Sequence, residues 1–229
     1  MADYKTLHGT NIETVASDPS NPVNGQVWYN STDQVLKGFT SSPAGSWASG
    51  GALNAARAEH GTTGTQTAAL VAAGSPGTKV NVETYDGSSW TEGSNLNRST
   101  GRKIASGAGA SNTAFLFFGG FVPANVALCE SWNGSSWTEV GDLNSARRGM
   151  AGLGTYTAAL CAGGSGATAQ TEQWNGTSWT EVNDLSLARN NFGGCGTTTA
   201  GLAAGGGSPG TGCEEWNSPS STTKQITEE

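Results

Sequence analysis

The sequence predicts an all-β protein built from four repeats, and three observations lead to this prediction. Trp47, Trp90, Trp137 and Trp179 each follow a serine and are separated by 43, 47 and 42 residues. A short apolar run that ends in small residues recurs between them. The chain has 35 glycines and only 13% charged residues. Because the tryptophans recur in register, we interpret the glycines as turns between short strands rather than as a sign of disorder.

The repeat contains several further ladders of equivalent residues. An arginine, an apolar Thr-Ala-x-Leu or Thr-Ala-Gly-Leu run, a pair of small residues and a glutamate two residues before an aromatic follow one another in each unit. The arginines are Arg57, Arg102, Arg147 and Arg189, and the glutamates are Glu83, Glu130, Glu172 and Glu214. Self-similarity at this period is the sequence pattern of repeat architectures.

The elements of one unit follow from local patterns. The apolar runs are too short and too closely bounded by glycine for helices, so we expect buried strands. The segments 85–90, 132–137 and 174–179 place Asp-Gly or Asn-Gly between aromatic residues. Such turns tolerate positive φ, and aromatic residues favour strands, so each segment is expected to form a hairpin. Each unit should therefore contain about four short strands.

A four-stranded repeat of this length is typical of propeller blades. Glycine pairs followed by an aromatic and then by a tryptophan five residues later resemble the Kelch motif, as in Gly120, Trp132 and Trp137. The resemblance covers residues 46–217 and implies a small β-propeller over residues 45–229. Four repeats are fewer than such propellers usually have. A four-bladed ring, an open fan and a ring completed by other chains all remain open.

The last unit suggests how the ends could meet. After Trp216 the chain continues with Ser218-Pro219-Ser220-Ser221, without a tryptophan at the expected place. Trp47 could supply the outer strand of this unit, which would remove an exposed sheet edge. Alternatively, Thr222-Thr223-Lys224-Gln225-Ile226 could form that strand.

Residues 1–44 lie outside the repeat and predict a β-hairpin segment. A Pro-rich turn precedes one strand around Val27, and a polar turn precedes a second around Leu36. An isolated hairpin is only marginally stable in water, so we expect it to dock on the repeats or on another subunit. The candidate docking residues are Val27, Trp28, Tyr29, Leu36 and Phe39.

The stretch from Asp18-Pro19 to Trp28-Tyr29-Asn30 resembles an N-terminal element of phage tail and fibre proteins. Combined with the repeat, it is similar to Kelch-like structural proteins of bacteriophages, cyanophages especially. The resemblance implies a virion structural protein, tail- or fibre-associated, that assembles in the host cytoplasm, forms a homo-oligomer (a trimer is one possibility) and contacts other virion proteins. A host-surface glycan is a further expected partner, with the loop Phe121-Val122-Pro123-Ala124-Asn125 as a contact.

Charge and composition exclude several function classes. The net charge of −7 and the lack of a Lys/Arg cluster argue against nucleic-acid binding. No apolar run is long enough to span a bilayer, so no membrane insertion is expected. Cys129, Cys161, Cys195 and Cys213 form no Cys-x-x-Cys pair, and we interpret them as small packing residues in strands.

No residue set points to catalysis. One Arg and one Glu recur in every repeat, so we expect structural ion pairs rather than a glycan-binding rim. Four equivalent carboxylates do not make a distinct acid and base. His8 and His60 are not repeated, so neither a metal nor another cofactor is expected. The tryptophan ladder is expected to pack rather than to stack on sugars.

The function expected from the sequence is therefore assembly of a virion, without enzymatic activity. The alternatives are a capsid decoration or head-fibre protein with the same fold and a free carbohydrate-binding propeller.

Overall fold

The computed structural model describes residues 12–40, 45, 47–98, 100–165, 169–206 and 210–218. The chain divides into two compact units, Met1–Ser49 and Gly50–Glu229, five residues beyond the boundary expected from the repeat. The described residues form β-strands and contain no helix, so the all-β prediction is confirmed. No helix in this part of the chain could therefore cross a membrane. The alternative outer strand at 222–226 lies outside the described residues.

The N-terminal unit contains a three-stranded sheet. Strands β2 (Val27–Asn30) and β3 (Val35–Gly38) form the expected antiparallel hairpin. A third strand that no sequence pattern predicted, β1 (Glu13–Val15), pairs parallel with β2. The N–H of Ser31 donates to Val15 O and continues this pairing. The segment is thus larger than a hairpin, which makes it less dependent on docking for its stability.

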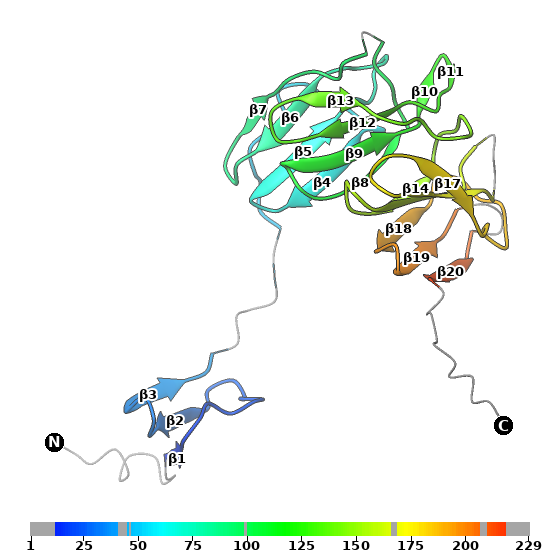
Figure 1. Ribbon diagram of the computed structural model, residues 1–229. Helices are drawn as coiled ribbons and strands as arrows, with labels where there is room; N and C mark the ends of the chain where they lie inside the picture. Colours follow the sequence, from blue (N-terminus) through cyan, green and yellow to red (C-terminus); the bar gives the residue numbers. More distant parts are fainter. Residues whose placement is uncertain are drawn as a thin grey trace, which may run out of the picture. The chain divides into compact units, whose positions relative to one another are not determined.

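The repeat unit contains four successive antiparallel sheets, drawn in order from cyan to orange in Figure 1. The first sheet comprises β4 (Gly61–Thr65), β5 (Ala68–Ala72), β6 (Val82–Tyr85) and β7 (Trp90–Glu92). The second comprises β8 (Ser106–Ser111), β9 (Ala114–Phe118), β12 (Cys129–Trp132) and β13 (Trp137–Glu139). The third comprises β14 (Ala151–Gly154), β15 (Ala159–Ala162), β16 (Thr171–Trp174) and β17 (Trp179–Val182).

The fourth sheet differs from the others. Among the described residues it has only three strands: β18 (Gly193–Gly196), β19 (Ala200–Ala204) and β20 (Cys213–Asn217). Trp47, assigned from the sequence to an outer strand, lies in no strand, and its side chain is fully exposed. A small hairpin, β10 (Phe121–Val122) and β11 (Ala124–Asn125), follows β9. Among the described residues, three units therefore have four strands and the last has three.

The glycine pairs of the repeat are explained by backbone conformation. Gly119 and Gly120 have φ of 64° and 115°, and Gly163 and Gly164 have 62° and 109°. Residues with a Cβ rarely adopt this left-handed region. The second glycine of each pair also links neighbouring sheets, because Gly120 N donates to Arg147 O and Gly164 N to Arg189 O, both at 2.8 Å.

The first strands of successive sheets pack side by side. Strand β4 lies against β8, β8 against β14, and β14 against β18, whereas the described residues do not repeat this packing between β18 and β4. The four strands border a hollow of about 230 Å³ lined by small residues such as Gly61, Gly107, Gly152 and Gly194. The sheets therefore form a fan around a common hollow.

A chain of backbone hydrogen bonds runs across all four repeats just before these strands. Ile104 N donates to Glu59 O at 2.8 Å, Gly149 N to Ile104 O at 2.9 Å, and Asn191 N to Gly149 O at 2.8 Å. All four residues have positive φ, between 52° and 65°. The same backbone position is thus bonded from each repeat to the next.

Candidate functional site

Arginine and glutamate pair within every sheet, as the register of the ladders predicts. The Nη2–carboxylate distances are 2.5 Å for Arg57–Glu83, 3.0 Å for Arg102–Glu130, 2.7 Å for Arg147–Glu172 and 2.7 Å for Arg189–Glu214. The arginine precedes the first strand of its sheet, and the glutamate lies on the third. Each pair therefore ties the segment that enters a sheet to the third strand of that sheet.

Backbone groups add further hydrogen bonds to each pair. Arg147 Nη1 donates to Gln170 O at 2.8 Å, and the second carboxylate oxygen of Glu172 accepts the N–H of Asn144 at 2.7 Å. Asn54 and Asn97 donate in the same way to Glu83 and Glu130. These groups are already engaged within the fold, which leaves the pairs unsuited to form a rim for an acidic glycan.

Electrostatics fit this structural role. Burial raises the pKa of Glu83, but the hydrogen bond from Asn54 N–H and the contact with Arg57 outweigh it, so the pKa lies below its usual value. Burial likewise opposes ionisation of Glu214, and the hydrogen bonds from Ser186 together with Arg189 leave its pKa lowered. Both carboxylates are therefore held in the charged form that the arginines require.

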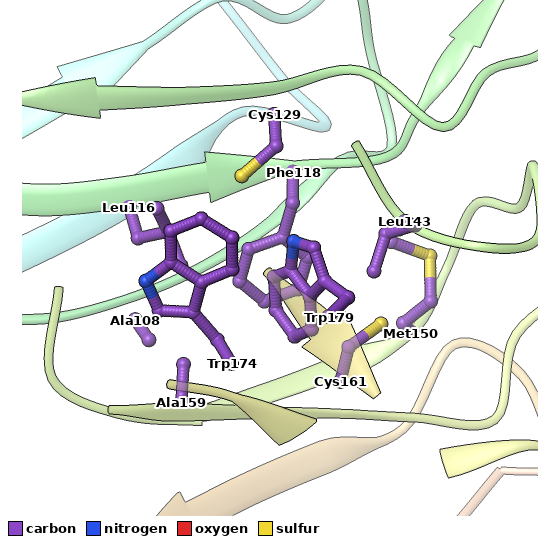
Figure 2. Close-up of a cluster of buried hydrophobic side chains, with 10 residues drawn as sticks. All are labelled: Ala108, Leu116, Phe118, Cys129, Leu143, Met150, Ala159, Cys161, Trp174 and Trp179. Atoms are coloured by element: carbon purple, nitrogen blue, oxygen red, sulfur yellow. The ribbon is translucent and has the colours of Figure 1, made fainter. Parts of the chain in front are cut away.

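The tryptophans fill the interfaces between successive sheets. Trp132 and Trp137 face each other across β12 and β13 with ring centroids 5.3 Å apart, and pack against Leu70 of the first sheet and Leu96 of the linker between the first and second sheets. Trp174 and Trp179, 5.4 Å apart, lie in the corresponding cluster between the second and third sheets. Figure 2 shows their indoles among Leu116, Phe118 and Met150.

The interface between the third and fourth sheets lacks one of these indoles. Trp216 of β20 occupies the position of Trp174, but the residue five further on is Ser221 instead of tryptophan. A cavity of about 70 Å³ lies here, lined by Leu160, Leu185, Gly201 and Trp216 among others. Leu96 and Leu143, the equivalents of Leu185, are buried, whereas Leu185 is half-buried. The described residues thus leave an apolar gap at this interface.

The edge of the fourth sheet is also more open to solvent. The Glu214 side chain is 22% exposed, against 1–2% for the three equivalent glutamates. In the other sheets Asn54, Asn97 and Asn144 donate their side-chain N–H to the carbonyl of the outer-strand tryptophan. Ser186 stands at this position in the fourth repeat.

The N-terminal sheet has two unlike faces. On one face Asp18 Oδ1 accepts hydrogen bonds from Trp28 Nε1 at 3.0 Å and Asn30 Nδ2 at 2.8 Å, and Asp18 Oδ2 lies 2.8 Å from Lys37 Nζ. These hydrogen bonds, that of Lys37 foremost, lower the pKa of Asp18 to about 2. Trp28 is 5% exposed, so this candidate docking residue lies on the occupied face of the sheet and offers little free surface.

The opposite face carries exposed apolar side chains. Val27 and Tyr29 alternate with the buried residues of β2, and Leu36 pairs directly with Tyr29 across the hairpin. Tyr29 is 37% and Leu36 59% exposed. Phe39, just beyond β3, is half-buried. Three of the five candidate docking residues thus form one exposed apolar face.

The cysteines fall into two groups. Cys129 and Cys161 are buried in the cluster of Figure 2, and burial raises the pKa of each thiol to about 12. Cys195 and Cys213 lie in strands of the fourth sheet but are exposed, so their interpretation as packing residues was wrong. All four are free thiols. Among the described residues, His, Cys, Asp and Glu side chains form no group of three that could hold a metal ion.

The hairpin β10–β11 is an insertion with its own supports. The Arg148 guanidinium lies 4.4 Å from the centre of the Phe121 ring and donates to Asn125 Oδ1 at 3.1 Å. Asn125 Nδ2 donates to Ser165 O at 3.0 Å. The loop named from the sequence as a surface contact is thus held by the neighbouring repeat.

Comparison with known proteins adds no family. No protein-family model matches the chain, and a search of curated proteins finds no match.

Proposed function

We propose that the chain is a virion structural protein of the phage tail or fibre type. The N-terminal sheet docks on a neighbouring virion protein, and the four repeats form a propeller-type body. The observation that carries this proposal is the apolar face of Val27, Tyr29 and Leu36 on a sheet whose other face is already occupied by the Asp18 network. An apolar patch presented by a small ordered element favours a binding role.

The repeat unit supports a scaffold role. Its recurring charged residues are paired internally, and its indoles fill the interfaces between sheets. The four first strands around one hollow fit the geometry of propeller blades. The assignment as a propeller is more specific than the all-β fold. Two features support it: the placement of the four first strands around one hollow and the four sequence repeats.

A carbohydrate-binding role receives less support. Trp132, Trp137, Trp174 and Trp179 are at most 6% exposed, so these four indoles offer no surface on which a sugar ring could stack. The hairpin β10–β11 remains the segment proposed for contact with the host surface, because the neighbouring repeat holds its base.

The test is incorporation into particles. A phage genome encoding Tyr29→Ser and Leu36→Ser together is compared with one encoding Val35→Ser, which alters an exposed apolar residue on the opposite face of the same sheet. We expect the unaltered protein and the Val35 variant in purified particles, and the double variant at a tenth of that level or less. Absence of the unaltered protein from particles would overturn the virion role.

A further inference from the structure

The two ends of the repeat unit differ, and the groups that are unpaired at one end are complementary to those that are unpaired at the other. The hydrogen-bond chain across the repeats starts at Glu59 and stops at Asn191. In the described part of the chain, neither Glu59 N–H nor Asn191 C=O has a hydrogen-bond partner. These are the donor and the acceptor that a further step of the same chain would join.

The apolar faces at the two ends are likewise complementary. The Tyr85–Trp90 pair, with centroids 5.0 Å apart, is half-buried, whereas the equivalent pairs in the next two sheets are buried against the preceding sheet. At the other end Leu202 and Ala204 occupy the positions of Leu116 and Phe118 in the second sheet, which pack against the third. Ala204 is exposed, and the described residues form no fifth sheet that could cover it.

We propose that a second copy of this chain completes the fan, and that its segment 47–49 forms the outer strand beside β20 that the described residues of this sheet lack. The register follows from the other sheets, where Trp132 pairs with Trp137 and Trp174 with Trp179. Trp47 of the second copy then pairs with Trp216, and its indole fills the gap beside Leu160 and Leu185. This proposal rests on the propeller-type arrangement proposed above, not on the virion role.

Sequence spacing places Trp47 next to this site. In three repeats the tryptophan of the outer strand stands six residues before a leucine in the linker to the next sheet, as in Trp137 and Leu143. Trp47 stands six residues before Leu53, and the next residue, Asn54, is bonded to Glu83 of the first sheet. The sheet that receives Trp47 must therefore directly precede a first sheet.

That preceding sheet belongs to another copy. The unit Gly50–Glu229 is compact, yet its described strands β18 and β4 do not pack as the successive first strands do. Propellers commonly have four to eight blades, so two chains of four sheets close a ring within this range and three do not. A two-fold ring buries both ends of both chains and leaves no open filament.

The chain's own C-terminal segment is a poorer occupant. It offers Ser221 where the other outer strands have tryptophan, so it supplies no indole for the gap. Trp47, in contrast, repeats the Ser-Trp step of the other outer strands and is fully exposed.

Cross-linking between single-cysteine chains tests the proposal. With Cys195→Ser and Cys213→Ser as background, full-length chains carrying Ala48→Cys are mixed with chains carrying Glu215→Cys under mild oxidation. These positions oppose each other in the proposed register, and directly paired strand residues are close enough for a disulfide. We expect a covalent dimer in the mixture and little in either chain alone. Absence of this dimer, or an intrachain bond in a monomeric double variant, would overturn the proposal.

The strength of self-association gives a second readout. Loss of a central buried tryptophan typically costs an interface about thirtyfold or more in Kd. We expect Trp47→Ala to weaken dimerisation by at least about that factor in sedimentation velocity, and the exposed control Tyr156→Ala to leave it unchanged. Equal dimer affinity of the Trp47 variant and the unaltered chain would also overturn the proposal.

Discussion

Arg147 Nη2 lies 2.7 Å from Glu172 Oε1, and both side chains are at most 2% exposed. The same pair recurs three times at the same place in the other sheets. An ion pair taken fully out of water is stable only if both partners and their remaining hydrogen bonds are present. The ladder of charged residues is therefore part of the core of each sheet.

Removal of one partner of this pair should be strongly destabilising. We expect Arg147→Met to lower the free energy of unfolding by about 3–5 kcal/mol, because Glu172 is left buried and unpaired. Arg189→Met should cost less, because Glu214 reaches solvent. Urea denaturation monitored by tryptophan fluorescence measures both, and equal losses would contradict this account.

Acid should weaken the N-terminal sheet in a defined range. The folded-state pKa of Asp18, about 2, lies below its ordinary value of 3.8. The stabilisation by Asp18 is therefore complete above about pH 4 and is lost as the pH falls towards 2. The NMR signal of the Trp28 indole N–H in the full chain should report this loss. The same transition in Asp18→Asn would assign it to another group.

The four thiols should react at two distinct rates. Cys195 and Cys213 are exposed, whereas Cys129 and Cys161 are buried and their pKa values are raised to about 12. A thiol reagent at pH 8 should modify two cysteines of the folded chain rapidly and the other two only after unfolding. Peptide mass mapping identifies the sites, and rapid modification of Cys161 would show that the core of Figure 2 is open.

The glycine pairs should resist substitution for two separable reasons. A Cβ at Gly119 would lie 2.7 Å from Arg147 O and would also meet Met150, and the residue has positive φ. Gly77 also has positive φ, but open space surrounds its Cβ position. We expect Gly77→Ala to cost about 1 kcal/mol from the backbone alone and Gly119→Ala to cost more. Thermal denaturation compares them, and equal costs would exclude the steric contribution.

The repeat made much of the structure predictable from the sequence. The ladders placed Arg147 and Glu172 in a common frame, and a charged pair repeated at fixed spacing points to an internal contact. Turn residues such as Asn133-Gly134 between two tryptophans fixed the hairpins. Where several residues repeat together, the same contact is predicted four times within one sequence, once in each repeat.

The parts outside the repeat were less predictable. Strand β1 has only three residues and pairs with β2 across a loop, so no periodic sequence pattern predicts it. Trp28 was expected to dock because it is large and apolar, but Asp18, ten residues earlier, accepts its indole N–H. The exposure of Cys195 and Cys213 follows from the open end of the fan, which a repeat register alone does not reveal.

The mass of the purified full-length protein under native conditions tests the central claim most directly. The chain should associate through the ends of its repeat unit, so native mass spectrometry at micromolar concentration should show two chains per particle, and Trp47→Ala should shift this population to single chains. If the unaltered protein is monomeric at this concentration, the result would contradict the account.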